Sequence, residues 1–167
     1  MSNIIYTIGH STILVEELFD LLKQYNITTL ADIRSVPYSQ FASQFNREPM
    51  EQLCHRNGIN YLFLGDSLGG KPGISSVGNN GSKMDYDYIS QQNYYLLGID
   101  KLLSLIGNYR ICLMCSEGLP DKCHRNLLVS KTLEKEGISV LHILPDGKTI
   151  NSSELNLIKN KGQLVLF

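Results

Sequence analysis

The sequence comprises 167 residues, of which 43% are hydrophobic and 19% charged, a profile typical of a single globular domain over residues 1–167. Its 15 basic and 16 acidic side chains give a net charge of −1, so a nucleic-acid partner has no support from bulk charge. The N-terminus has no signal-peptide pattern, and no apolar run approaches the roughly 20 residues that span a bilayer. We therefore expect a cytoplasmic protein with no membrane partner and four free thiols.

Short apolar runs alternate along the chain with segments of helical periodicity. The runs predict five strands, at 4–8, 28–33, 59–64, 109–114 and 139–143. The periodic segments predict helices at 14–25, 47–57, 85–106 and 122–136, with a short helix from 152 and an edge strand at 163–167. This order predicts a three-layer α/β domain, in which a mainly parallel five-stranded sheet carries helices on both faces.

In a parallel sheet, ligands bind outside the C-terminal ends of the strands. Polar or glycine-rich residues lie at or after the end of each predicted strand in turn: His10 and Ser11, then Asp32 and Arg34, then Gly69, Gly70 and Lys71, then Cys115 and Glu117, and finally His142. We therefore expect a ligand site at this edge, bordered by the long loop from 65 to 83 acting as a lid.

The segment from Leu113 to Arg125 carries the most chemical information. Cys115 ends a predicted strand, and Cys123, His124 and Arg125 open a predicted helix. Free N–H groups at a helix start attract anions and lower the pKa of a nearby thiol. Basic residues in that turn favour contact with a phosphate or carboxylate. The alternative is that Arg125 pairs with the Glu117 side chain and closes the loop.

Other chemistries fit the spacing of this segment less well. Nine residues separate Cys115 from Arg125, which excludes the Cys-x5-Arg loop of phosphatases and rhodaneses. Cys115, Cys123, His124 and His10 are suitable zinc ligands, but adjacent Cys123 and His124 rarely share one metal. We therefore predict no metal site, and the sequence identifies no cofactor.

Candidate roles follow from these positions. The catalytic candidates are Cys115, His10 and Glu117; the ligand-binding candidates are Ser11, Asp32, Arg34, Gly69, Gly70, Lys71, Cys123, His124 and Arg125. His10 is either an acid/base group or a structural histidine. Asp32 and Arg34 either contact the ligand or pair with each other. Cys54 and Cys112 are expected in the core, and His142 is expected to be structural.

Several motifs in this order also carry a family resemblance. They are Thr7–Ser11, Asp32–Ser39, Gln44–Asn46, Gly58–Tyr61, Leu68–Pro72, Met114–Glu117 and Cys123–Arg125. On these motifs the chain resembles the uncharacterised bacterial and archaeal family catalogued as Domain of Unknown Function 488. It departs from the family at Gln40, where an arginine is usual, and at Ser43, where a proline is common. The resemblance implies the fold and the motif set but brings no established reaction.

The leading hypothesis is that a small phosphate-bearing or nucleotide-like ligand binds at the sheet edge. Arg34, Lys71 and Arg125 would bind the anion, and the chemistry would depend on the cysteines and histidines. The alternative is a ligand-sensing or nucleic-acid-associated module that does no chemistry, or a purely structural interaction protein. The sequence does not decide whether the protein is an enzyme.

Overall fold

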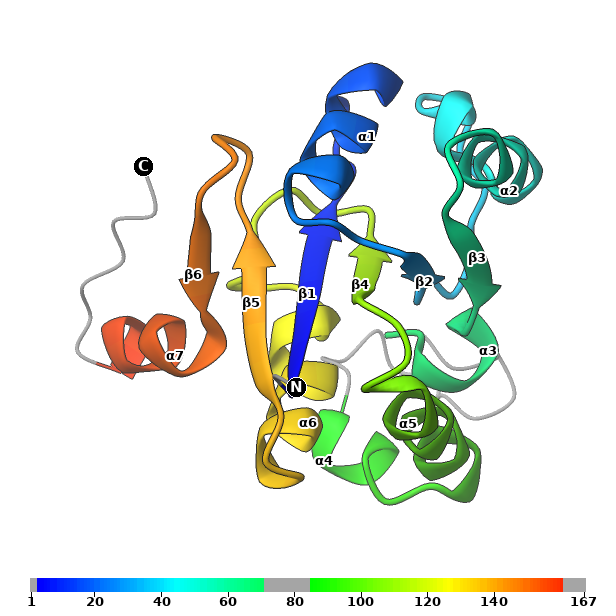
Figure 1. The fold of residues 1–167 in the computed structure, drawn as a ribbon. Helices are drawn as coiled ribbons and strands as arrows, with labels where there is room; N and C mark the ends of the chain where they lie inside the picture. Colours follow the sequence, from blue (N-terminus) through cyan, green and yellow to red (C-terminus); the bar gives the residue numbers. More distant parts are fainter. Residues whose placement is uncertain (1–2, 71–84, 161–167) are drawn as a thin grey trace.

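A computed structural model describes residues 3–70 and 85–160 of the chain. A six-stranded sheet with the order β3-β2-β4-β1-β5-β6 forms its centre (Figure 1). The strands are β1 (Ile4–Gly9), β2 (Thr29–Asp32), β3 (Asn60–Phe63), β4 (Ile111–Cys115), β5 (Ser139–Ile143) and β6 (Thr149–Asn151). The first five strands are parallel, which confirms the predicted α/β class.

The expected count of five strands is wrong, because β6 pairs antiparallel with β5. A tight turn after β5 reverses the chain, with Gly147 at a φ of 84° and its N–H bonded to Leu144 O at 2.8 Å. Only three residues of β6 pair, so the run is too short to stand out in the sequence. The edge strand expected at 163–167 lies outside the described residues.

Helices cover both faces of the sheet, and alternate residues of β4 divide between the two cores. One face packs α1 (Val15–Gln24) and α2 (Arg47–Arg56) against Cys112 and Met114. The other packs α5 (Asn93–Leu105), the π-helix η3 (Arg125–Ser130) and α6 (Lys131–Lys135) against Ile111 and Leu113. Every β4 residue is buried, as a central strand requires.

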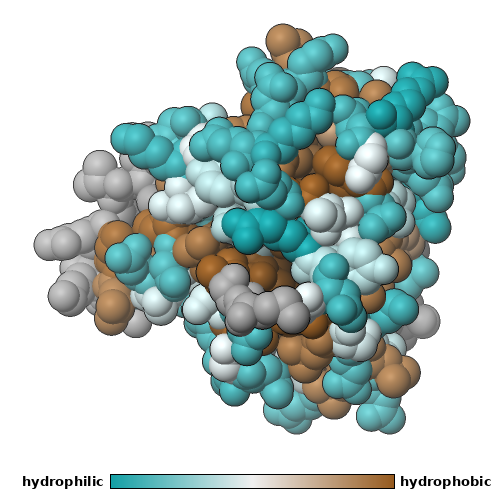
Figure 2. All heavy atoms as spheres, viewed as in Figure 1, coloured by the Kyte–Doolittle hydropathy of each residue, from teal (hydrophilic) through white to brown (hydrophobic). Residues whose placement is uncertain are grey.

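The remaining elements lie at the margins of these layers. They are the 3₁₀ turn η1 (Ser43–Phe45) and the helices α3 (Gly65–Leu68), α4 (Tyr86–Ile89) and α7 (Ser152–Asn160). A space-filling view from the same side shows mostly hydrophilic side chains over α1 (Figure 2). In the part of the chain that the structure describes, no helix has the length and apolar character to cross a membrane.

Several helix boundaries differ from the expectation. The segment 85–106 divides into α4 and α5, and the long loop at 65–83 begins with the short helix α3. Helix α1 is capped at Leu14, where the Glu17 side chain accepts a hydrogen bond from the Leu14 N–H. The fourth major helix begins at Arg125 as a π-helix, a form often found at functional sites.

The strand order places a topological switch point between β1 and β4. The chain leaves β1 to reach β2 by passing over β4, and it leaves β4 to reach β5 by passing over β1. With right-handed crossovers, these two connections run to opposite faces of the sheet. Ligands of open α/β sheets bind near such a point, so the ends of β1 and β4 are the part of the fold to examine for function.

Candidate functional site

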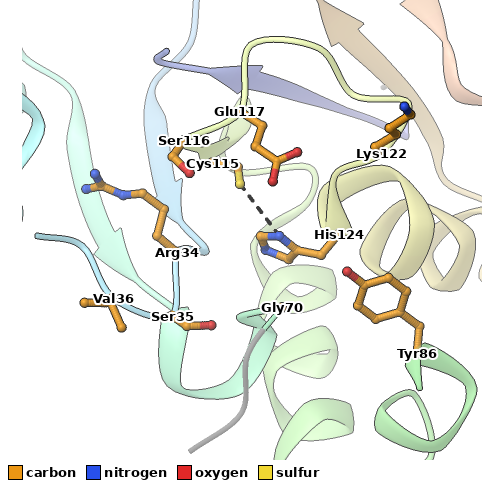
Figure 3. Close-up of a pocket in the computed structure, with 10 residues that line it drawn as sticks. All are labelled: Arg34, Ser35, Val36, Gly70, Tyr86, Cys115, Ser116, Glu117, Lys122 and His124. Carbon is orange, nitrogen blue, oxygen red and sulfur yellow. Dashed lines mark hydrogen bonds between the residues drawn. The ribbon is translucent and has the colours of Figure 1, made fainter. Parts of the chain in front are cut away.

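An open cavity of about 240 Å³ lies at the C-terminal ends of β2 and β4 (Figure 3). Its walls come from the three connections that follow β2, β3 and β4, as expected for the rim of a parallel sheet. The lining residues are Arg34, Ser35, Val36, Gly70, Tyr86, Cys115, Ser116, Glu117, Lys122 and His124. Arg34, Gly70, Cys115, Glu117 and His124 are residues that the sequence singled out.

Two thiols and an imidazole meet at the base of this cavity. The Cys115 Sγ lies 3.2 Å from the Cys123 Sγ and 3.7 Å from the His124 Nδ1, and the Cys123 Sγ lies 3.8 Å from that nitrogen. His124 Nε2 lies 3.1 Å from the Ile33 carbonyl oxygen, which can only accept a hydrogen bond. Neutral His124 therefore carries its proton on Nε2 and turns the Nδ1 lone pair toward both sulfur atoms.

The two thiols differ in their affinity for a proton. The pKa of Cys115 is lowered well below its usual value, first by the S–H hydrogen bond from Cys123 and then, against the cost of burial, by the hydrogen bond and positive charge of His124 when that imidazole is protonated. The pKa of Cys123 is raised, because its proton is held in that same bond. Burial raises the pKa of Cys54 to about 12. The lowered thiol pKa in this segment therefore falls on Cys115, and its main cause is the hydrogen bond from Cys123, not the helix start that the sequence suggested.

The Arg34 guanidinium is hydrogen-bonded to other side chains of the protein. Its Nε and Nη2 donate to the two carboxylate oxygens of Asp32 at 2.9 and 2.7 Å, and its Nη1 contacts the His10 Nε2 at 3.2 Å. In Figure 3 the guanidinium points away from Cys115 and His124. The alternative in which Asp32 and Arg34 pair is therefore the arrangement present, and it leaves little of Arg34 to hold an anion.

His10 lies beside the cavity without lining it. Its Nδ1 is 2.8 Å from the Ser11 carbonyl oxygen, so Nδ1 carries the proton and Nε2 accepts from Arg34. The ring stacks on Phe45 with centroids 4.5 Å apart. Burial lowers the pKa of His10, and the positive charge of Arg34 lowers it further. These contacts correspond to the structural alternative for His10.

Arg125 closes the loop after β4, although not through a carboxylate. The residue is 0% exposed; its Nε donates to Thr7 Oγ1 at 3.1 Å and its Nη2 to the Gly118 carbonyl at 3.1 Å. Its Nη1 donates to the Glu117 carbonyl. Arg125 therefore does not reach the cavity, and the Glu117 carboxylate is left exposed at the cavity wall.

The loop after β4, which Arg125 holds through its hydrogen bonds, also fills the crevice between the ends of β1 and β4. A Cβ at Gly9 would lie 1.5 Å from the Glu117 carbonyl oxygen, so only glycine allows this approach. Ser11, a predicted ligand contact, instead donates its N–H to the Ser116 carbonyl at 2.9 Å. The open cavity is consequently displaced from β1 toward β2.

The glycine loop contributes one of its predicted residues to the lining. Gly70 borders the cavity, where a Cβ would lie 2.8 Å from the His124 side chain. Gly69 is buried against Ser35 instead. Lys71 and most of the expected lid lie outside the described residues.

Sequence reasoning missed Lys122, Tyr86 and Ser35 as lining residues. Lys122 directly precedes Cys123, and that adjacency could have drawn attention to it. Tyr86 opens α4, and burial raises the pKa of its hydroxyl. Ser35 follows Arg34, and nothing in its local sequence distinguishes it.

Cys123 and His124, although adjacent in the sequence, can share one metal ion with Cys115. Adjacent side chains usually diverge, yet both Cys123 and His124 direct a donor atom at Cys115. The three donor atoms all lie within 4.8 Å of one another, so these residues could hold an ion. His10, the fourth candidate ligand, is held by Ser11 and Arg34 instead.

Comparison with known proteins identifies the family but no activity. No curated protein and no solved structure matches the chain. One family model, described as a domain of unknown function, matches residues 14–132, which include the whole Cys115–Cys123–His124 cluster. The chain therefore belongs to the family Domain of Unknown Function 488.

Proposed function

We propose that this protein is an enzyme that acts on a small ligand in the cavity at the ends of β2 and β4. The observation that carries the proposal is the cluster of Cys115, Cys123 and His124 at the cavity base. Buried thiols that serve only packing are surrounded by apolar side chains, as Cys54 is in the α2 core. Cys115 instead shares a cavity wall with polar and ionisable groups, an arrangement typical of a reaction centre.

The lining also indicates the class of ligand. Lys122 is exposed at the cavity wall and offers an ammonium group, whereas the guanidinium of Arg34 is engaged by Asp32 and His10. Among the described lining residues Lys122 is the one ammonium, and one ammonium suits a ligand with one phosphate or carboxylate better than a polyphosphate. We therefore propose a group with one phosphate or carboxylate as the part of the substrate that Lys122 recognises.

Two further residues have roles in this proposal. The Glu117 carboxylate lies beside Cys115 and His124 in Figure 3. In this proposal it transfers protons to or from the ligand. His10 acts as a positioning residue. Its backbone N–H donates to the Cys115 carbonyl at 2.9 Å and its ring holds Arg34, so it fixes the end of β4.

Selective alkylation tests the proposal. The reduced protein, in buffer with a chelator, would be treated with iodoacetamide near neutral pH and the modified cysteines mapped by mass spectrometry. Cys115 should react several-fold faster than Cys54 and Cys112, since neither of these lines the cavity. Inorganic phosphate or AMP should slow the reaction at Cys115, and Lys122→Ala should abolish that protection.

The same experiment can contradict the proposal. Equal, slow labelling of all four cysteines would exclude thiol-dependent chemistry and favour the binding module. Protection of Cys115 by long single-stranded DNA, but not by phosphate or AMP, would favour a nucleic-acid partner instead.

A further inference from the structure

We infer that Cys115, Cys123 and His124 form a metal centre for a Zn²⁺-type ion, with the fourth coordination position open to the cavity. The inference rests on the proposed function, because it names the cofactor of the same reaction centre. It depends on the geometry of three donor atoms, on the orientation of one imidazole ring and on the open side of the cluster.

The donor separations match one face of a coordination tetrahedron. With Zn–S near 2.3 Å and Zn–N near 2.0 Å, tetrahedral angles place two sulfurs about 3.8 Å apart and a sulfur and a nitrogen about 3.5 Å apart. The two S···N separations are 3.7 and 3.8 Å, and the S···S separation is 3.2 Å. An opening of about 0.6 Å between the sulfurs would complete the match.

His124 is oriented as metal-binding histidines are. Its Nε2–H donates to the Ile33 backbone carbonyl at 3.1 Å, which fixes the tautomer that leaves Nδ1 free to bind an ion. Cys115 and Ile33 stand at the ends of neighbouring strands, since β2 pairs with β4 and the Ile33 N–H donates to Met114 O. The sheet therefore holds both Cys115 and the Ile33 carbonyl group that orients His124.

The chemical nature of the donors selects the ion. Two thiolates and an imidazole favour Zn²⁺ and similar borderline ions over Mg²⁺ or Ca²⁺, which prefer oxygen ligands. Three protein ligands with an open position are typical of catalytic zinc, whereas structural zinc has four. Cys115 and His124 both line the cavity, so the open position faces the space where the ligand would bind.

The position of Glu117 gives that open site a chemical use. Its carboxylate lies on the same wall as Cys115 and His124 (Figure 3). Hydrolytic zinc sites with two cysteines and a histidine pair the ion with a glutamate that is not a ligand and moves protons. The ligand class that this centre would take is therefore water together with a small substrate that undergoes hydrolysis.

Cobalt substitution tests the inference without a known substrate. The reduced, chelator-treated full chain would be titrated with Co²⁺ under anaerobic conditions and followed by absorption. We expect one ion per chain, with thiolate-to-cobalt charge transfer and the strong d–d bands of tetrahedral Co²⁺. Zn²⁺ should displace Co²⁺ and raise the melting temperature of the protein.

Matched variants locate the site. Cys115→Ser, Cys123→Ser and His124→Ala should each lose the tetrahedral Co²⁺ spectrum, whereas Cys54→Ala, which removes a thiol from the α2 core, should keep it. His124→Cys should also keep it, because a third thiolate replaces the imidazole; a purely structural histidine would not be rescued in this way. Circular dichroism confirms that each variant is folded before titration.

Three outcomes separate this inference from the proposed function. No Co²⁺ uptake by the folded, reduced wild type, or equal uptake by Cys115→Ser, overturns the metal centre, while selective, phosphate-sensitive alkylation of Cys115 would still support the enzyme. Azide added to the Co²⁺ protein should shift the d–d bands, and unchanged bands would overturn the open position. Tight Co²⁺ binding with no ligand protection of Cys115 would confirm the metal and count against the proposed function.

Discussion

His142 makes a quantitative prediction about stability and pH. The side chain is 0% exposed and lies between Thr7 and Asn126. Arg125 donates to the Thr7 hydroxyl, so that hydroxyl donates its own hydrogen to His142 Nδ1 at 2.7 Å. His142 Nε2–H in turn donates to Asn126 Oδ1 at 3.2 Å. Both ring nitrogens are thus satisfied in the neutral form, and a second proton on Nδ1 would point at the Thr7 hydroxyl hydrogen and break that hydrogen bond.

The magnitude follows from the pKa of this histidine. Burial lowers it from 6.5 to about 3, and the positive charge of Arg125 acts in the same direction. Because the folded-state pKa is depressed, the unfolded chain takes up the proton first as the pH falls. The stabilisation is complete above about pH 6.5 and is lost progressively toward pH 3. Each pH unit in this window is worth about 1.4 kcal/mol, so a fall from about pH 7.5 to about pH 5 costs about 2 kcal/mol.

Urea unfolding at both pH values measures this loss. Wild type would be compared with His142→Gln, because the variant has no titrating group at this position. A chelator would be present in both samples. The variant should lose about 2 kcal/mol less than wild type over the interval. His55→Gln, which removes an exposed histidine of α2, should lose as much as wild type. Equal losses in wild type and His142→Gln would refute the reasoning.

Two further substitutions test the loop after β4. Gly9→Ala should destabilise the fold by about 3 kcal/mol, because its Cβ would overlap the backbone carbonyl of Glu117; Gly118→Ala, whose Cβ has its nearest neighbour at 3.4 Å, should change the urea midpoint little. Equal midpoints for the two variants would contradict this contact. Arg125→Met should cost about 3 kcal/mol, because it leaves a buried hydroxyl and two loop carbonyls without their donor. A cost below about 1 kcal/mol would show that water replaces the guanidinium.

The sequence pattern predicts the architecture well because hydrophobic periodicity reports burial directly. The five parallel strands and the helices on both faces follow from that pattern. The missed strand β6 has only three residues, two of them polar, and it depends on the turn at Gly147. The break between α4 and α5 likewise has no marker in the sequence, since neither proline nor glycine occurs in 90–92.

The candidate site is predictable in position and less so in detail. Ligands of parallel sheets bind at the C-terminal ends of the strands, and Cys115, Glu117 and His124 do line one cavity there. The sequence leaves two directions open for Arg34, and it does not show where Arg125 points, because tertiary structure supplies the acceptors of the Arg125 guanidinium. Arg34 binds a carboxylate two residues away, whereas Arg125 binds backbone carbonyls of a loop that only the packing against Gly9 brings within reach.

Three consecutive residues, Cys123, His124 and Arg125, connect the stability of the loop with the chemistry of the site. The first two direct donor atoms at Cys115, while Arg125 turns to Thr7 and to the carbonyls of the loop. Among the described side chains Arg125 has no carboxylate partner within salt-bridge distance, so its buried charge opposes the rise in the Cys123 pKa. That charge favours anionic sulfur in the cluster, which is the state that binds an ion. The arginine that closes the loop therefore also prepares the thiols for their proposed role.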